Sequence, residues 1–174
     1  GAALGAYHLM LGRERKPQAG MDRMKGAYLG PCYETPEIES RLKAVGAVFT
    51  TVSDDQVTEL TAQALAEGKA VGWHQGRMEF GPRALGGRSI IADPRSPVVQ
   101  KQLNLKVKYR ESFRPFAPSV LREDVSDWFD IESDSPYMLL VADVLQAHQI
   151  PMTAEQEALF GIEKLNVPRS TLPA

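Results

Sequence analysis

Apolar side chains recur at a helical spacing between Ser53 and Gly68. Ser53 and Gln56 form a capping box at the start of this stretch, and Gly68 ends it. The apolar residues that fall on one side of the predicted helix are Val57, Leu60, Ala64 and Leu65. This pattern predicts an amphipathic helix with one face toward a core.

Three further helices are predicted from the residues at their ends. They cover Ala2 to Gly12, Thr35 to Val45 and Ser96 to Lys106. The first is rich in Ala and Leu and ends on a glycine, and the other two begin with a Ser or Thr N-cap followed by proline. In the third helix, Leu103 and Val107 are expected to face the core.

Short β-branched or apolar runs between the helices predict strands. These runs are Ala47 to Val52, Ala70 to His74, Ser89 to Ala92, Ala117 to Leu121 and Met138 to Val144. Because strands and helices alternate along the chain, the predicted fold class is α/β, with strands that need not all be parallel.

Residues 13–33 carry glycine, proline and mixed charges without a period, as a linker does. We therefore place a linker at residues 15–33, the end of a preceding domain at residues 1–14 and a second domain at residues 34–174. Asn166 to Ala174 contains two prolines and no closing element, so the second domain is expected to be incomplete at its C-terminal side.

The composition is that of a globular protein, with 43% hydrophobic and 24% charged residues, which excludes disordered and fibrous classes. No run reaches the roughly 18 to 20 apolar residues that a membrane span needs. The single cysteine, Cys32, cannot form an intrachain disulfide or a multi-cysteine metal site. It fits a reducing compartment, and a cytoplasmic location is expected.

The net charge of −2 is unevenly distributed along the chain. Residues 77–122 hold ten basic and three acidic side chains, a local balance of +7, and the other ten basic side chains face nineteen acidic ones, a balance of −9. A cationic segment in an acidic protein attracts a small anion, whereas the acidic surroundings repel a nucleic acid backbone. A small anionic ligand is therefore predicted.

The first basic loop, Gly76–Ser89, lies between two predicted strands. Its glycines allow main-chain N–H groups to face a phosphate, and each of its arginines can bind two oxygens of a phosphate at once. These residues are Gly76, Gly81, Gly86, Gly87, Arg77, Arg83 and Arg88. The spacing matches neither the Walker loop nor the dinucleotide-binding GxGxxG pattern. The alternative is a tight turn with solvated arginines.

The second basic loop, Lys106–Ser119, mixes cations with aromatic residues and prolines. The prolines stiffen its backbone, Phe113 and Phe116 are expected to be buried, and Lys108 and Arg114 are expected to project from the other side. The alternative is a strand whose charges are merely exposed.

Two motifs in these loops resemble the C-terminal region of the O-carbamoyltransferases, a family that modifies antibiotics and rhizobial nodulation factors. They are Gly-Arg-Met-Glu-Phe-Gly-Pro-Arg-Ala-Leu-Gly within residues 76–95 and Arg-Glu-Ser-Phe-Arg-Pro-Phe-Ala-Pro-Ser-Val-Leu at residues 110–121. Weaker similarity extends over most of the chain. The resemblance implies a YrdC-like twisted mixed sheet with flanking helices for residues 34–174, and the end of an actin-like ATPase domain at residues 1–14.

The resemblance also implies a two-step reaction with ATP as co-substrate. Carbamoyl phosphate and ATP would form carbamoyladenylate in the YrdC-like domain, and the actin-like domain would pass the carbamoyl group to a hydroxyl of a small-molecule or oligosaccharide acceptor, such as a nodulation factor or an antibiotic. By motif, the implied catalytic residues are Lys108 and Arg114, and the implied substrate-binding residues are Arg83, Arg88, Arg110, Gly81 and Gly86. Activity of these 174 residues alone is not expected.

Two departures from the family pattern affect this interpretation. Gly87 stands where the family usually has Asn, which removes a possible side-chain hydrogen bond. The family's later His-Val-Asp and Asn-Thr-Ser-Phe-Asn segments are not found, so the site is expected to be incomplete.

No metal is expected in this chain, because His8, His74 and His148 lack ligand-like spacing. The resemblance places a metal only in the actin-like domain. No membrane or nucleic-acid partner is expected, although a non-catalytic nucleotide- or RNA-binding YrdC-like module remains the alternative function.

The remaining conspicuous residues are given structural roles. Trp73, Trp128 and Phe129 are expected in the core, and the acidic run Glu123 to Asp134 is expected to form a solvated helix and turn.

Overall fold

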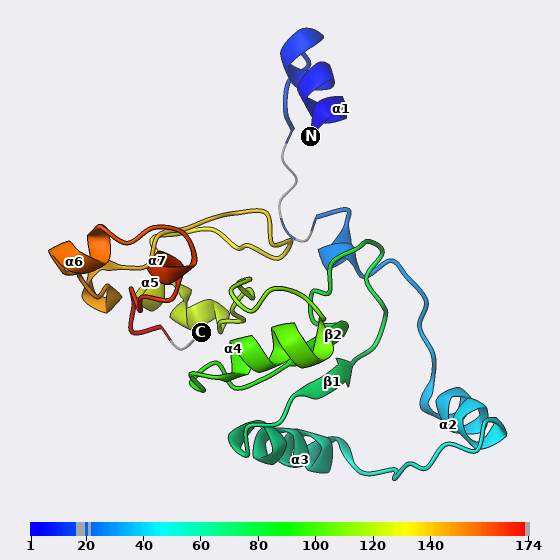
Figure 1. Cartoon of the computed structure of the whole chain (residues 1–174). Helices are drawn as coiled ribbons and strands as arrows, with labels where there is room; N and C mark the ends of the chain where they lie inside the picture. The colour runs from blue at the N-terminus through cyan, green and yellow to red at the C-terminus, as the bar shows by residue number, and fades with distance from the viewer. Residues whose placement is uncertain (17–19, 21, 173–174) are drawn as a thin grey trace.

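The computed structural model describes residues 1–16, 20 and 22–172. Helix α1, Ala2–Gly5, continues as a wider π-helical turn at Ala6–Met10, and Gly12 follows with φ of +59°. The predicted N-terminal helix is therefore confirmed, together with its terminal glycine. The helix stands apart from the rest of the chain (Figure 1), and Leu9 is 86% exposed.

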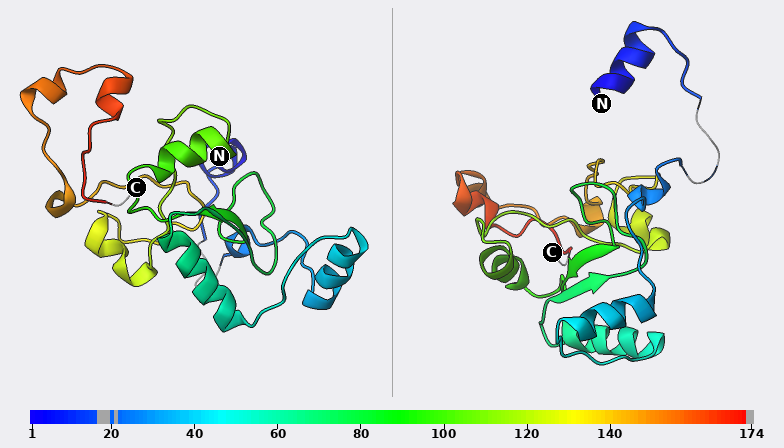
Figure 2. Two further views of the ribbon diagram at one scale, coloured as in Figure 1. Left: turned by 60° about the horizontal axis from the view of Figure 1, so that its bottom comes forward. Right: turned by 90° about the vertical axis from the view of Figure 1, so that its right-hand side faces the viewer.

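An antiparallel hairpin and one long helix form the regular centre of the molecule. Strand β1, Val71–His74, pairs with β2, Arg88–Ile91, in a register that places Val71 opposite Ile91 and His74 opposite Arg88. Helix α3, Asp54–Ala66, contacts β1. Figure 2 shows the hairpin and the helices from two further directions. The capping box between Ser53 and Gln56 is formed, as predicted.

Helices α2 and α4 form where helices were predicted, but they begin differently. Helix α2, Thr35–Ala44, has Glu34 at its N-cap, so Thr35 is the first helical residue and not the cap. Helix α4, Val99–Gln102, continues as a π-helical segment at Leu103–Val107. The predicted start at Ser96 is wrong, because the chain first makes a turn in which the Ser96 N–H donates to the Asp93 carbonyl at 3.2 Å.

Three predicted strands are absent from the described residues. They are Ala47 to Val52, Ala117 to Leu121 and Met138 to Val144, and they are irregular in the structure. A strand needs a neighbour to accept its backbone hydrogen bonds, and here Val48 is fully exposed while Val144 forms only an isolated bridge to Phe129. The α/β class is confirmed, but the sheet has two strands in place of the predicted twisted mixed sheet.

The C-terminal third consists of short helical pieces. A 3₁₀ turn at Arg122–Asp124 leads into α5, Val125–Trp128, and further pieces follow at Gln146–His148, α6 Ala154–Glu157 and α7 Ile162–Leu165. The acidic run predicted to be a solvated helix and turn falls on the first two pieces and on the residues after them, through Asp134. Its main packing contact is Trp128, which stacks on His148 with ring centres 4.3 Å apart.

Little of the described chain is buried. The accessible surface is 14188 Å², against about 8400 Å² for a compact monomer of this mass. The buried apolar residues are Ala27, Val99 and Leu103, whereas Trp73, Trp128 and Phe129, predicted in the core, are only half-buried. Within the described residues, no helix has the length and apolar character that crossing a membrane requires.

Within the described residues, two buried side chains are polar: one lies in the first basic loop, and the other lies in the helical segment that leads into the second. Glu79 is 4% exposed and Asn104 is completely buried. A buried polar group must be hydrogen-bonded to be tolerated, so the partners of these two residues define how the loops are built.

Candidate functional site

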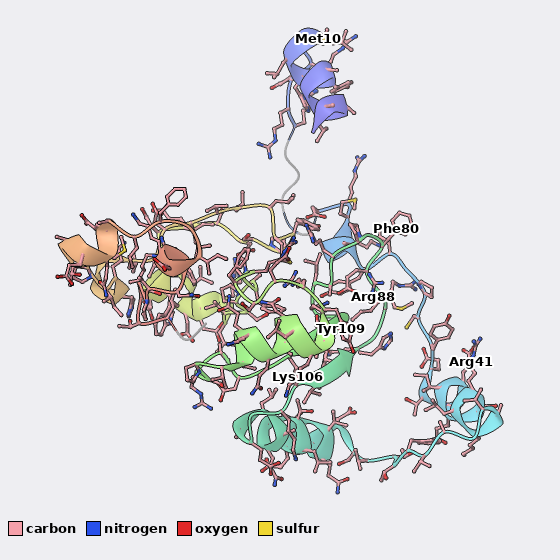
Figure 3. All side chains as sticks on the ribbon, viewed as in Figure 1. Met10, Arg41, Phe80, Arg88, Lys106 and Tyr109 are labelled. Carbon is pink, nitrogen blue, oxygen red and sulfur yellow. The ribbon has the colours of Figure 1, made fainter. Side chains whose placement is uncertain are left out.

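Glu79 organises the first basic loop. Its Oε1 accepts hydrogen bonds from the backbone N–H groups of Leu85 at 2.6 Å and Gly87 at 2.7 Å. Its Oε2 accepts from Nε of Arg88 at 2.9 Å, and Nη2 of Arg88 donates to the Gly81 carbonyl at 3.0 Å. One carboxylate thus fixes the path of the chain from Gly81 to Arg88, the first residue of β2, which is labelled in Figure 3.

These hydrogen bonds determine the ionisation of Glu79. Burial on its own raises the pKa of the carboxyl group, but donation from Leu85, the Arg88 guanidinium and Gly87 outweighs burial and lowers the pKa from 4.5 to about 2. Glu79 is therefore ionised at neutral pH, and its charge is matched by that of Arg88.

A segment from the predicted linker supports the same loop. Residues 27–31 run antiparallel to residues 78–80, joined by three backbone hydrogen bonds of 2.7 to 2.9 Å. Nη1 of Arg77 donates to the Gly30 carbonyl at 2.6 Å, and the Tyr28 hydroxyl donates to the Leu85 carbonyl. Residues 17–19 and 21 of the predicted linker lie outside the described residues.

Gly87 lies where these elements meet. A Cβ atom at this position would come within 3.0 Å of the Arg77 carbonyl oxygen, 3.1 Å of the Tyr28 ring and 3.2 Å of Glu79 Oε2. These distances are shorter than ordinary van der Waals contacts. The Asn that the family usually carries here would therefore require the Tyr28 ring or the loop to move.

Asn104 organises the second basic loop. Its Nδ2 donates to the carbonyls of Ser112 at 3.1 Å and Arg114 at 2.8 Å, and its Oδ1 accepts from Nε of Arg110 at 2.6 Å. Gln100 on α4 also donates to the Arg114 carbonyl, at 3.1 Å. The helix that begins at Val99 thereby holds the loop that follows it.

The aromatic residues of the second loop differ from each other. Phe116 is half-buried beneath the guanidinium of Arg110, whose central carbon lies 4.8 Å from the ring centre. Phe113 is 38% exposed, so its predicted burial is wrong. Tyr109, labelled in Figure 3, is 86% exposed and has φ of +48°, which turns the chain sharply before Arg110.

The structure separates the cations predicted to be functional into two groups. Arg88, Arg110 and Arg114 are hydrogen-bonded to Glu79, Asn104 and Glu111, respectively. The side chains of Arg83 and Lys108 are exposed and make no hydrogen bond or ion pair within the described part of the chain, although the backbone N–H of Lys108 donates to the Leu103 carbonyl at 2.9 Å. These two cations are available to bind an anion from solution.

Two hollows adjoin the first loop. One, of about 300 Å³, is lined largely by apolar side chains and by Arg83, Gly81 and Leu85. The other, of about 410 Å³, is lined by Gly86 and Ser89 of the first loop and by Ser119 of the second. Gly86 also donates its N–H to the Ser89 hydroxyl at 3.1 Å. The two loops therefore meet at the second hollow, beside Gly86.

Sequence reasoning missed the two residues that shape the loops. Glu79 had a usable signal, because it is the only acid among the three arginines and four glycines of its loop. Asn104 had a weaker one, a residue of poor helix propensity between apolar neighbours in a predicted helix. Tyr28 gave no signal, since its contact with Leu85 spans 57 residues.

Among residues 1–16, 20 and 22–172, no group of three or more His, Cys, Asp or Glu side chains is placed to hold a metal ion. Two of the histidines bond to backbone carbonyls: His8 to Arg13 at 2.7 Å and His148 to Asp127 at 2.9 Å.

Comparison with known proteins gives a consistent family assignment. Residues 62–160 match the family described as Carbamoyltransferase C-terminus. An uncharacterized protein of Synechocystis is 58% identical over a region that covers all of this chain and 28% of that protein. Nodulation protein NolO of Bradyrhizobium diazoefficiens is 41% identical, again over all of this chain and over 32% of its own length.

A third relative has an enzyme name. The 3'-hydroxymethylcephem-O-carbamoyltransferase of Amycolatopsis lactamdurans is 47% identical over 76 residues, which are 44% of this chain and 14% of that enzyme. The chain spans less than a third of the length of these curated relatives.

Proposed function

Because this chain belongs to the carbamoyltransferase C-terminus family, we propose that it forms the anion-binding part of an O-carbamoyltransferase that uses carbamoyl phosphate and ATP. The product of this part would be carbamoyladenylate. The carbamoyl group would then pass to a hydroxyl of a small molecule, as the name of the cephem enzyme suggests, or to a hydroxyl of an oligosaccharide.

The observation that carries this proposal is the free state of Arg83 and Lys108 on loops of fixed shape. Both cations lack an internal partner among the described residues, while Glu79 and Asn104 hold the backbone around them. Because the backbone that carries these cations already has its shape before the ligand arrives, only the two side chains need to be ordered on binding. Each charge-assisted hydrogen bond contributes about 1.5 to 3 kcal/mol.

In the proposed chemistry, hydrolysis of carbamoyl phosphate precedes the two steps of adenylate formation and carbamoyl transfer. Carbamoyl phosphate loses its phosphate to water and leaves carbamate. A carbamate oxygen then bonds to the α-phosphorus of ATP as pyrophosphate leaves, which gives carbamoyladenylate. The acceptor hydroxyl finally attacks the carbamoyl carbon and releases AMP. Anionic phosphoryl groups occur in every step, and basic side chains can stabilise them.

The test is ATP–pyrophosphate exchange by the full-length protein, measured with and without carbamoyl phosphate. Arg83→Ala and Lys108→Ala should each reduce the exchange rate by about tenfold or more, the equivalent of about 1.4 kcal/mol for each lost contact. Arg41→Ala is the matched control, because Arg41 is an exposed arginine on α2 that pairs with Glu37, outside both loops. Unchanged exchange in both variants, or no exchange in the unmodified protein, would refute the proposal.

A further inference from the structure

The arginines of the basic segment differ in the charge of their partners. Four of them bond to a carboxylate, in the pairs Arg88–Glu79, Arg95–Asp93, Arg114–Glu111 and Arg122–Asp134. A carboxylate partner cancels most of the charge that an external anion would feel. Arg110 is different, because the side chain that holds it is the neutral amide of Asn104.

Arg110 is held firmly on one side. Its Nε donates to Asn104 Oδ1 at 2.6 Å, its backbone N–H donates to the Asn104 carbonyl at 3.0 Å, and its guanidinium lies over the Phe116 ring. Its two terminal nitrogens bond to no group in the described part of the chain. The neighbouring carboxylate of Glu111 is hydrogen-bonded to Arg114 at 2.8 Å, and it interacts with Arg110 electrostatically, without a hydrogen bond.

The neutral side chain of Asn104 can hold the Arg110 guanidinium without neutralising it, which a carboxylate could not do. It is completely buried, and its side chain uses both donor and acceptor atoms. An aspartate of the same shape would direct oxygen at the Ser112 and Arg114 carbonyls and would neutralise Arg110. The amide therefore fixes the guanidinium and leaves its charge intact.

We propose that Arg110 binds an oxyanion through its two terminal nitrogens and that Asn104 is the positioning residue that orients it. The ligand class is a phosphoryl or carboxylate group, since the planar guanidinium edge matches two oxygens of such a group. The identification of this anion with the phosphoryl group of the substrate rests on the proposed function. The binding of an oxyanion by Arg110 does not depend on the proposed function.

The first experiment measures the affinity of the full-length protein for inorganic phosphate by isothermal titration calorimetry. Arg110→Lys keeps the charge but loses the planar edge and the Nε donor, and it should weaken binding by about tenfold. Asn104→Asp should weaken it at least as much. Gln100→Ala is the matched control, because it removes a hydrogen bond to the same Arg114 carbonyl without contacting Arg110, and its affinity should be unchanged.

Chemical rescue separates positioning from a general effect on folding. Added methylguanidinium should restore phosphate affinity to Arg110→Ala, whose thermal unfolding midpoint is recorded alongside. The same addition should not restore affinity to Asn104→Asp. In turnover assays, the Arg110→Lys and Asn104→Asp variants should raise KM for carbamoyl phosphate more than they lower kcat.

Two results would overturn this inference. One is unchanged phosphate affinity in Arg110→Lys and Arg110→Ala, and the other is a loss in Gln100→Ala as large as that in Asn104→Asp. A protein that binds phosphate in this pattern but forms no carbamoyladenylate would refute the proposed function and leave the inference standing. Adenylate formation by a protein whose phosphate affinity is unchanged in Arg110→Lys and Arg110→Ala would do the reverse.

Discussion

The two basic loops are built on the same plan with opposite electrostatic results. In the first loop, the buried carboxylate of Glu79 collects two backbone N–H groups and Arg88. In the second loop, the buried amide of Asn104 binds two backbone carbonyls and Arg110. Each loop depends on one buried polar side chain, but only the first one neutralises its arginine.

The basic side chains therefore fall into two groups: those whose charge is neutralised within a loop and those whose charge can act on a ligand. Arg88 completes the first loop and contributes little charge to the outside, whereas the Arg83 side chain in the same loop has no partner among residues 1–16, 20 and 22–172. In the second loop, Arg110 is both fixed and charged. A count of basic residues along the sequence therefore overstates the number of cations that can meet a ligand.

The largest expected effect comes from removing the charge of Glu79. Glu79→Gln keeps the shape of the side chain but leaves Arg88 without its anion and directs an amide N–H group at backbone donors. The Arg88 side chain is 37% exposed and can be solvated by water, but three charge-assisted hydrogen bonds to Glu79, each worth about 1.5 to 3 kcal/mol, are weakened together. Hydrogen exchange in the full-length protein should show lost protection at the amides of Leu85 and Gly87.

The control for this variant is Glu111→Gln in the second loop. Glu111 is an exposed carboxylate that pairs with Arg114, and exposed pairs contribute little to stability. Exchange at Leu85 and Gly87 should be unaffected by it. Equal losses from both substitutions would contradict the contrast between the loops.

Acid should weaken the first loop before the second. The pKa of Glu79 is about 2 in the folded chain, below its ordinary value of 4.5, so its contribution to stability is complete above pH 4.5 and is lost as the pH falls toward 2. A pKa difference of this size corresponds to about 3 kcal/mol. Asn104 does not titrate. Over this range, exchange corrected for its intrinsic pH dependence should accelerate at Leu85 and Gly87, with a smaller change at Arg110.

The acid effect has its own control in Glu79→Gln, which should lack the additional acceleration between pH 4.5 and 2. If both loops opened together at every pH, the separate roles of the two buried side chains would be wrong.

The smallest expected effect is steric and confined to the first loop. Gly87→Ala places a methyl group 3.0 Å from the Arg77 carbonyl and 3.1 Å from the Tyr28 ring, and overpacking of this kind costs about 1 to 3 kcal/mol. The cost should fall in the Tyr28→Ala background, where the ring is absent. A double-mutant cycle on the unfolding free energy measures this coupling, and strict additivity would show that Tyr28 does not limit the space at Gly87.

Short-range signals predicted much of the helical structure. The capping box at Ser53 and Gln56 and the glycine at Gly12 act within a few residues, so the helices they delimit are where the sequence places them. The strand at Ala47 to Val52 failed for the opposite reason: its β-branched residues favour an extended chain, but a strand needs a second segment to pair with.

The candidate site also combines features that short-range sequence signals predicted with features that depend on contacts formed on folding. The motifs around Arg83 and Arg110 resemble the C-terminal region of the O-carbamoyltransferases, and the comparisons confirm the carbamoyltransferase C-terminus family. No local rule, however, indicates that Arg88 is neutralised while Arg83 is free, because the partner of Arg88 is nine residues away and its carboxylate is held by Leu85 and Gly87.

The amino-acid sequence by itself thus determined the presence of the helices and some of their ends, the cationic segment and the family, since these depend on residue types at short, fixed spacings. Tertiary structure alone decided which polar side chains are buried, and with them which arginines keep their charge. The physical reason is that a hydrogen bond in a buried site stabilises one particular pair of groups, and chain folding selects that pair from many chemically equivalent ones.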